Sequence, residues 1–129
     1  IQLKNGLSVV LEDGSTLEPE TVCDDPEPPK RYAYCSDTAY SEKVIEAIKG
    51  CSTVYHESTF LESEAERAKS TFHSTARQAA QVAKAAGAKR LILGHFSSRY
   101  ATEELFKVEA SAIFNNVSLA NEGMVFTVH

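Results

Sequence analysis

The sequence contains no apolar run that approaches the length of a membrane span, and no charged-then-apolar signal segment at its start. Its three cysteines, Cys23, Cys35 and Cys51, are odd in number and show no Cys-x-x-Cys spacing. We interpret them as reduced residues of a cytoplasmic protein and not as ligands of a structural zinc finger. Internal repeats and low-complexity segments are also absent, which excludes repeat architectures.

Charge is distributed unevenly along the 129 residues. The net charge of −5 argues against loose, non-specific binding to nucleic acid. Residues 12–27, however, contain seven acids and no bases, whereas residues 67–107 contain eight bases and two acids. The second half of the chain is therefore compatible with a local basic face that recognises phosphates.

Residues 1–30 are predicted to form a hairpin and a proline-rich connector outside the main domain, which covers residues 31–129. Leu7–Leu11 and Thr16–Glu18 flank Asp13-Gly14, a dipeptide typical of hairpin turns. Residues 23–30 carry three prolines and several acids, a composition that favours an extended connector over a helix.

From residue 32 onwards the pattern alternates between strands and helices. Strands are predicted at 32–35, 53–56 and 89–94, and helices at 41–50, 61–69, 75–86 and from Thr102 onwards. Such alternation predicts an α/β fold with a mostly parallel sheet covered by helices. Thr75 and Gln78 match a capping box, and the alanines at 76, 79, 80 and 83 form a narrow face suited to close packing on the sheet.

The last helix and the C-terminus complete the predicted domain. Leu105, Val108 and Ala112 are spaced for one inward face of the helix that Thr102 would cap. Residues 117–119 and 124–128 flank a turn sequence at 121–123, which predicts a final hairpin or turn.

Polar side chains follow the predicted strands at the points where the strands end: Asp37, His56 with Glu57, His73 before the long helix, and His95. Because the carboxyl ends of parallel strands share one edge of a sheet, we expect Asp37, Glu57, His73 and His95 to converge. Carboxylate and imidazole are ligands of zinc and related metals, and Asp37 and His95 would supply two of them. His73 lies at the start of a helix, a position that suits a bound anion such as a phosphate. Alternatively, His73 could act as a general acid oriented by Glu57.

Each of these residues also has a structural interpretation. Asp37 can cap the turn that follows it, Glu57 can be a surface turn residue, and His73 can hydrogen-bond at the helix end. His56 lies within a strand, so we interpret it as a hydrogen-bonded core residue and not as a ligand. Their joint position at strand ends, and not any single residue, favours a functional site.

Four segments around these positions carry a resemblance. They are 34–38 (Tyr-Cys-Ser-Asp-Thr), 56–60 (His-Glu-Ser-Thr-Phe), 73–79 (His-Ser-Thr-Ala-Arg-Gln-Ala) and 91–100 (Leu-Ile-Leu-Gly-His-Phe-Ser-Ser-Arg-Tyr). In their order and spacing they resemble ribonuclease Z, the family of tRNA 3′-processing endonucleases within the metallo-β-lactamase superfamily. From residue 31 to the end, the resemblance implies the C-terminal half of an αβ/βα sandwich with a two-zinc active site.

The resemblance also implies a role for each strand-end residue. Asp37 would bridge the two zinc ions and His95 would bind the second. Glu57 and His73 would handle protons, with His73 as the general acid that protonates the leaving 3′ oxygen. A zinc-bridged hydroxide would attack the phosphorus and so remove the 3′ trailer from precursor tRNA. The residues implied to contact a substrate phosphate are Arg99, Ser74 and Thr75.

The family's His-x-His-x-Asp-His motif, which supplies most of its metal ligands, does not occur in residues 1–129. We therefore expect the chain to be the C-terminal half of a longer enzyme, with the N-terminal half and precursor tRNA as partners and a homodimer at full length. Alone, it should bind metal weakly and cleave nothing. Two other interpretations stay open: a different metal-dependent phosphodiesterase or hydrolase of the same superfamily, and a non-catalytic α/β binding module.

Overall fold

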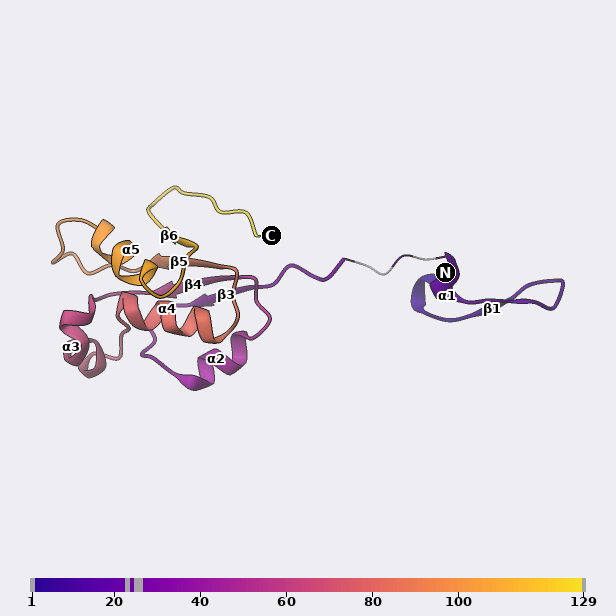
Figure 1. Ribbon diagram of the computed structural model, residues 1–129, viewed down its shortest axis with the longest axis horizontal. Helices are drawn as coiled ribbons and strands as arrows, with labels where there is room; N and C mark the ends of the chain where they lie inside the picture. The colour runs from indigo at the N-terminus through magenta and orange to yellow at the C-terminus, as the bar shows by residue number, and fades with distance from the viewer. Residues whose placement is uncertain (1, 23, 25–26, 129) are drawn as a thin grey trace.

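A computed structural model describes residues 2–22, 24 and 27–128 of the chain. Its elements in chain order are η1 (Leu3–Asn5), β1 (Val9–Val10), β2 (Thr16–Leu17), α1 (Pro19–Val22), β3 (Tyr32–Cys35), α2 (Glu42–Ile48), β4 (Thr53–Glu57), η2 (Glu62–Glu64), α3 (Ala65–Ser70), α4 (Ala76–Ala85), β5 (Arg90–Gly94), α5 (Glu104–Ser111) and β6 (Val117–Leu119). Strands β3 to β6 form one parallel sheet in the order β3-β4-β5-β6 (Figure 1). The predicted α/β fold with a parallel sheet is confirmed.

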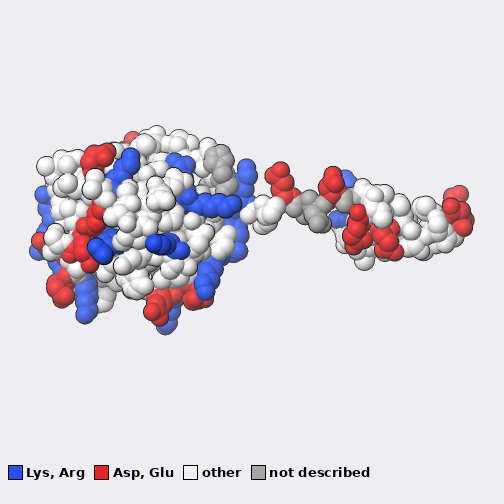
Figure 2. Space-filling model, in the orientation of Figure 1, with Lys and Arg blue, Asp and Glu red and all other residues white. Residues whose placement is uncertain are grey.

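The N-terminal residues form the predicted hairpin, with β1 and β2 antiparallel and Val9 opposite Leu17. Gly14 takes a φ of 81° in the connecting turn, a conformation that favours glycine. The hairpin stands apart from the body that contains the sheet (Figure 1), and acidic side chains gather on it (Figure 2). Helix α1 after the hairpin was not predicted. Of the predicted connector, residues 24 and 27–30 have no helix or strand, while residues 23, 25 and 26 lie outside the described residues.

The core lies where helix α4 packs on the sheet. Leu91 and Leu93 of β5 are fully buried and pack with the alanine face of α4, Ala76, Ala79, Ala80 and Ala83, as predicted. Small side chains allow the helix to lie close against the strands. Both halves of the capping box at Thr75 and Gln78 are also formed, which fixes the start of α4 beside His73.

Helix α5 corrects one prediction. It begins at Glu104, two residues after the predicted cap, and Leu105 and Val108 are 49% and 69% exposed. Phe106 and Ala110 are buried in their place. The sequence offers two apolar stripes on this helix, and the stripe with Phe106 faces inward because its ring packs between those of Phe96 and Tyr100. Ala112, expected to point inward, is also exposed.

The predicted final hairpin or turn is confirmed only as a turn, in which the amide of Met124 donates to the carbonyl oxygen of Asn121 at 3.1 Å. Residues 117–119 form β6, which joins the sheet parallel to β5, whereas residues 124–128 form no strand. Pairing with β5 stabilises this apolar strand and covers an edge of β5 that would otherwise be open. No helix among the described residues is long and apolar enough to cross a membrane.

Gly94 at the end of β5 makes a close approach to Tyr55 of β4. A Cβ atom on Gly94 would lie 2.3 Å from the hydroxyl oxygen of Tyr55, so any larger residue would displace this ring. The ring of Tyr55 also stacks on that of Tyr34 at 4.5 Å between centroids, and burial raises the pKa of Tyr55 to about 12.

Candidate active site

The predicted convergence of the strand-end residues is confirmed. Asp37 follows β3, Glu57 ends β4, His73 precedes α4 and His95 follows β5, and their side chains meet at one edge of the sheet. Asp37, His73 and His95 each offer one ligand atom, and these atoms all lie within 4.8 Å of one another. Parallel pairing of β3, β4 and β5 brings together residues that lie 58 positions apart in the sequence, between Asp37 and His95.

Glu57 is the buried centre of the cluster, with a side chain that is 0% exposed. One carboxylate oxygen, Oε1, accepts a hydrogen bond from Nδ1 of His73 at 2.8 Å. The other, Oε2, accepts from the backbone N–H of Thr59 at 3.0 Å and from its hydroxyl at 2.8 Å. Because both oxygens are hydrogen-bonded, the carboxylate is stabilised in the interior and holds the His73 ring in place.

Thr59 connects this buried pair to His95. Its hydroxyl proton is donated to Glu57, so its oxygen acts as the acceptor for Nδ1 of His95 at 2.9 Å. The hydrogen-bond network therefore assigns the proton of the neutral His95 ring to Nδ1 and leaves the lone pair on Nε2. That nitrogen lies 3.3 Å from Oδ1 of Asp37, facing the mouth of the site.

The same network assigns the tautomer of His73. Its Nδ1–H donates to Glu57, so Nε2 carries the lone pair in the neutral ring and takes up a proton when the ring becomes charged. The side chain is 24% exposed, which leaves it accessible from solvent. His73 is thus oriented by a carboxylate in the manner of a general acid or base.

Asp37 and His95 form the exposed part of the site, with side chains that are 67% and 44% exposed. Both take left-handed backbone conformations, with φ of 49° and 58°. Such conformations are uncommon outside glycine and concentrate at functional sites. The 3.3 Å between their ligand atoms is close to the separation of about 3.3 Å that two ligands have on a tetrahedral zinc with bonds of about 2.0 Å. These two residues therefore fit a shared metal ion.

The three residues implied to contact phosphate lie in different surroundings. The guanidinium of Arg99 lies over the ring of Phe60 at 5.2 Å and 3.5 Å from a carboxylate oxygen of Glu64, and the Phe60 ring in turn meets His73 edge-on. Ser74 and Thr75 are fully buried, and their hydroxyls donate to the Thr38 carbonyl and to Glu62. A phosphate contact by either hydroxyl would have to replace an internal hydrogen bond.

His56 lies in the core and outside the cluster, as interpreted from the sequence. It is fully buried, and its Nδ1 bonds to the carbonyl oxygen of Glu57 at 2.7 Å. Burial lowers the pKa of His56 below its ordinary value and so favours the neutral ring. Its Nε2 is the one buried side-chain N or O atom without a hydrogen-bond partner in the part of the chain that the structure describes.

Sequence reasoning missed the role of Thr59, although the residue lies in the resemblance motif at 56–60. The only indication is a hydroxyl two positions after Glu57, since its contact with His95 spans 36 residues.

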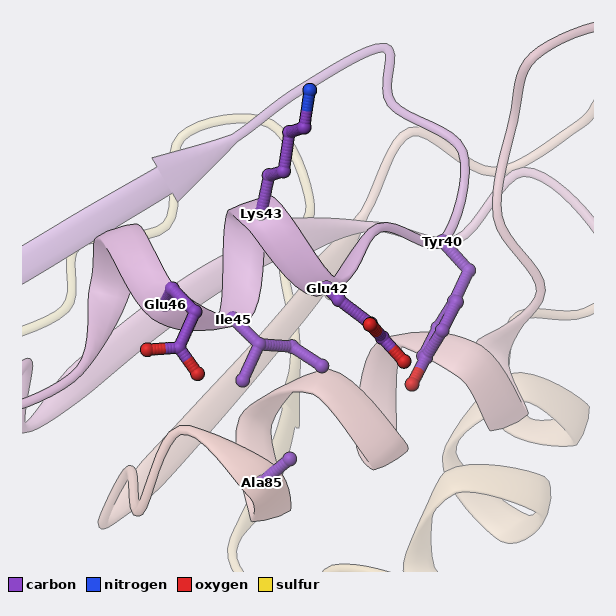
Figure 3. A pocket seen from close by; sticks show the side chains of 6 residues that line it. All are labelled: Tyr40, Glu42, Lys43, Ile45, Glu46 and Ala85. Carbon is purple, nitrogen blue, oxygen red and sulfur yellow. The ribbon is translucent and has the colours of Figure 1, made fainter.

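A hollow of about 750 Å³ elsewhere, between α2 and α4, is lined by Tyr40, Glu42, Lys43, Ile45, Glu46 and Ala85 (Figure 3). None of the strand-end residues lines it, so we do not assign the chemistry there.

Comparison with known proteins gives consistent results. A family model described as the Beta-lactamase superfamily domain matches residues 24–96. The chain is 42% identical over 127 residues to the ribonuclease Z of Bacteroides fragilis (strain YCH46), covering 98% of this chain and 42% of that protein. It is 49% identical over 128 residues to the ribonuclease Z of Cytophaga hutchinsonii, covering 98% and 41%. The chain thus spans about two fifths of the length of these curated relatives.

Two solved structures resemble the fold. The metallo-beta-lactamase fold protein YhfI from Bacillus subtilis superposes with a TM-score of 0.68 at 25% identity, covering 73% of this chain and 38% of that one. Human tRNase Z, short form, superposes with a TM-score of 0.52 at 32% identity, covering 66% and 27%. The predicted resemblance and the metallo-β-lactamase-type fold are both confirmed.

Proposed function

The chain belongs to the beta-lactamase superfamily, and on that premise we propose that it is the C-terminal part of a zinc-dependent endoribonuclease that removes the 3′ trailer from precursor tRNA. The observation that carries this proposal is the hydrogen-bonded chain from His73 through Glu57 and Thr59 to His95. It links a candidate proton donor to a candidate metal ligand within one site. Relatives at 42% and 49% identity named ribonuclease Z support the choice of substrate.

We assign the proton transfer to His73. In its charged form the ring carries protons on both nitrogens, and Nδ1–H stays bonded to the buried Glu57. The proton on Nε2 is then free to pass to the 3′ oxygen that leaves when the phosphodiester bond breaks. Glu57 is a positioning residue here, because it holds the ring through the hydrogen bond to Nδ1 without touching the substrate. Arg99 is our candidate for a contact to a neighbouring phosphate.

Asp37 and His95 would hold the metal, since their donor atoms fit one coordination sphere. When bound, zinc would supply Lewis-acid polarisation to the phosphate and to the water that attacks it. Thr59 contributes by keeping the proton of His95 on Nδ1, so that Nε2 remains the donor atom. We infer that further ligands come from a partner segment that corresponds to the remaining three fifths of the relatives. The chain alone would then bind metal weakly and cleave nothing.

The proposed setting follows from the same relatives. We propose precursor tRNA as the substrate, a homodimer as the assembly of the complete enzyme and the cytoplasm as its compartment. We propose that the hairpin of residues 9–17 is also part of this enzyme, because the similarity to the relatives extends over 98% of the chain.

The test is a chimera in which this chain replaces the matching segment of 128 residues in the ribonuclease Z of Cytophaga hutchinsonii. We expect metal-dependent cleavage of a precursor tRNA at its 3′ trailer, and its loss in Asp37→Ala. Glu46→Ala is the matched control, because Glu46 is an exposed carboxylate on α2 that forms an ion pair with Lys49 and lies outside the site. Zinc binding without cleavage of tRNA would support a metal-dependent hydrolase of the same superfamily whose substrate is a different phosphodiester. The absence of both zinc binding and cleavage would favour the non-catalytic binding module.

A further inference from the structure

Phe72, the residue immediately before His73, combines two unusual properties. Its side chain is 76% exposed, although it is a large apolar ring. Its backbone is left-handed, with a φ of 61°, which is a genuine outlier for a bulky residue. Among the described residues, no ring or cation contact involves its side chain.

The backbone around Phe72 explains the conformation but not the side chain. The amide of Phe72 donates to the carbonyl oxygen of Lys69 at 3.3 Å, and the amide of His73 donates to that of Ala68 at 2.8 Å. This pair of bonds closes helix α3 with a Schellman motif, in which the left-handed position is usually glycine. The turn sets the position of His73, and a glycine would close it without strain.

Two other helices of the same chain show the usual solution. After α2 and α4, the left-handed positions are occupied by Gly50 and Gly87, with φ of 80° and 73°. Only after α3, of these three, does an aromatic residue occupy the left-handed position. Its ring gains little from burial, because it remains in solvent. Folding therefore does not account for the phenylalanine at this position.

The surroundings of Phe72 point to a ligand. Helix α3 lies at the end of the body opposite to the side on which the N-terminal extension joins it (Figure 1). This is the end towards which the parallel strands run and at which the active-site residues meet. His73 follows directly, the ring of Phe60 meets His73 edge-on, and Arg99 lies over Phe60. The residue next to His73 in the sequence thus carries an exposed aromatic ring, and a guanidinium group lies over the ring that contacts His73.

We propose that Phe72 is a stacking platform for an unpaired nucleobase of the substrate, next to the phosphate that is cleaved. The inference rests on the proposed function, because it takes the substrate to be RNA. Single-stranded RNA is commonly bound by stacking of its bases on aromatic side chains, and every base has a face that can stack. In this proposal, the left-handed backbone directs the ring towards the substrate, and the adjacent His73 reaches the leaving oxygen.

A tryptophan at position 72 would report base stacking through a change in its fluorescence. The chain contains no tryptophan, so Phe72→Trp introduces a single fluorescent reporter. We expect a short single-stranded RNA, added at low ionic strength, to quench its emission saturably, and an abasic RNA of the same length to leave it unchanged. Val125→Trp is the matched control, because Val125 is 92% exposed on the C-terminal segment and should not respond. Equal quenching by both RNAs, or none by either, would overturn the proposal.

Phe72→Gly separates stacking from a structural role. Glycine suits the left-handed turn, so we expect the midpoint of thermal unfolding to stay the same or to rise. The affinity for the single-stranded RNA should fall on the order of 10-fold, as removal of one stacked base contact does. A lower unfolding midpoint would show that the ring is a folding contact and would contradict the proposal.

These results can be told apart from a failure of the proposed function. If the chimera does not cleave precursor tRNA but RNA quenches the reporter at position 72, the stacking site stands and the assigned reaction fails. If the chimera cleaves and Phe72→Gly leaves its KM for precursor tRNA unchanged, the reaction stands and the stacking site fails. A reporter that is already buried in the chimera without RNA would show that Phe72 contacts the rest of the enzyme and would also overturn it.

Discussion

Two carboxylates of the site, Glu57 and Asp37, lie in opposite environments. The side chain of Glu57 is fully buried, and both of its oxygens accept hydrogen bonds from His73 and Thr59. The side chain of Asp37 is 67% exposed, and its nearest polar contacts are the two histidine rings at 3.3 and 4.0 Å. Glu57 is enclosed by the protein and accepts three hydrogen bonds, whereas Asp37 is open to solvent.

This difference separates two roles for the same functional group. A buried carboxylate that accepts three hydrogen bonds can orient and stabilise its partners but is not accessible to a metal or substrate. An exposed carboxylate beside an imidazole lone pair can bind a cation. We therefore expect substitution of Glu57 to change stability as well as activity, and substitution of Asp37 to change mainly activity. Four variants test this contrast.

The largest effect is expected for Asp37→Ala. In the chimera with the Cytophaga hutchinsonii enzyme, cleavage of precursor tRNA should fall by ~10³-fold or more, because a proposed metal ligand is lost. The free energy of unfolding of the isolated chain should fall by at most about 1 kcal/mol, because the side chain is exposed and the left-handed backbone at this position disfavours alanine only modestly relative to aspartate. Urea unfolding measures this directly, and a large loss of stability would remove the contrast with Glu57.

Glu57→Ala should reverse that pattern in the isolated chain. Removing the carboxylate leaves the Nδ1–H of His73 and the amide of Thr59 without their acceptor. We expect the free energy of unfolding to fall by about 2–3 kcal/mol. The matched control is Glu46→Ala on the surface of α2, which should leave stability almost unchanged. Equal effects of the two variants in urea unfolding would contradict the assigned role of Glu57.

Thr59→Val sharpens the contrast, because it breaks the link between the buried and exposed parts with little change in shape. Without the hydroxyl, nothing in the described network fixes the proton of His95 on Nδ1. Zinc affinity of the chimera, measured by competition with a chelating dye, should fall by about 10- to 100-fold. Thr102→Val is the control, since Thr102 is exposed and lies outside the site. Unchanged zinc affinity in Thr59→Val would count against the bridge.

The smallest effect concerns His56, which lies behind Glu57 in the core. Burial lowers the pKa of His56 below its ordinary value of 6.5, so the unfolded chain binds a proton more readily than the folded chain. Stability should therefore fall as the pH is lowered below about 6.5, with a limiting slope of about 1.4 kcal/mol per pH unit from this residue. Urea unfolding of wild type and His56→Gln between about pH 7.5 and pH 5.5 measures the contribution. An equal slope in both would contradict it.

Much of the site was predictable because it depends on the backbone. The patterns of β3, β4 and β5 indicate parallel strands, and parallel strands bring their carboxyl ends together whatever the details of packing. The capping box at Thr75 is local, so its four residues suffice to predict where α4 begins. Convergence of Asp37, Glu57, His73 and His95 follows from these two features.

The features that were missed depend on competition between side chains. Two apolar stripes compete on α5, and only the packing of Phe106 between two aromatic rings decides which one is buried. The bridge from Thr59 to His95 needs hydroxyl and imidazole directions across 36 residues, which no local pattern contains. The left-handed backbone at Phe72 was not predicted, because this position at the end of a helix is usually occupied by glycine and rarely by a bulky residue.

The most direct measurement is a long-range ¹H–¹⁵N spectrum of the histidine rings in this chain, with and without zinc. We predict that the neutral rings of His73 and His95 both carry their proton on Nδ1. Zinc should shift the Nε2 resonance of His95, and this shift should disappear in Asp37→Ala but persist in Glu46→Ala. An Nε2-protonated His95, or a zinc response that Asp37→Ala leaves intact, would contradict the assignment of a metal-binding carboxylate at Asp37 and an orienting carboxylate at Glu57.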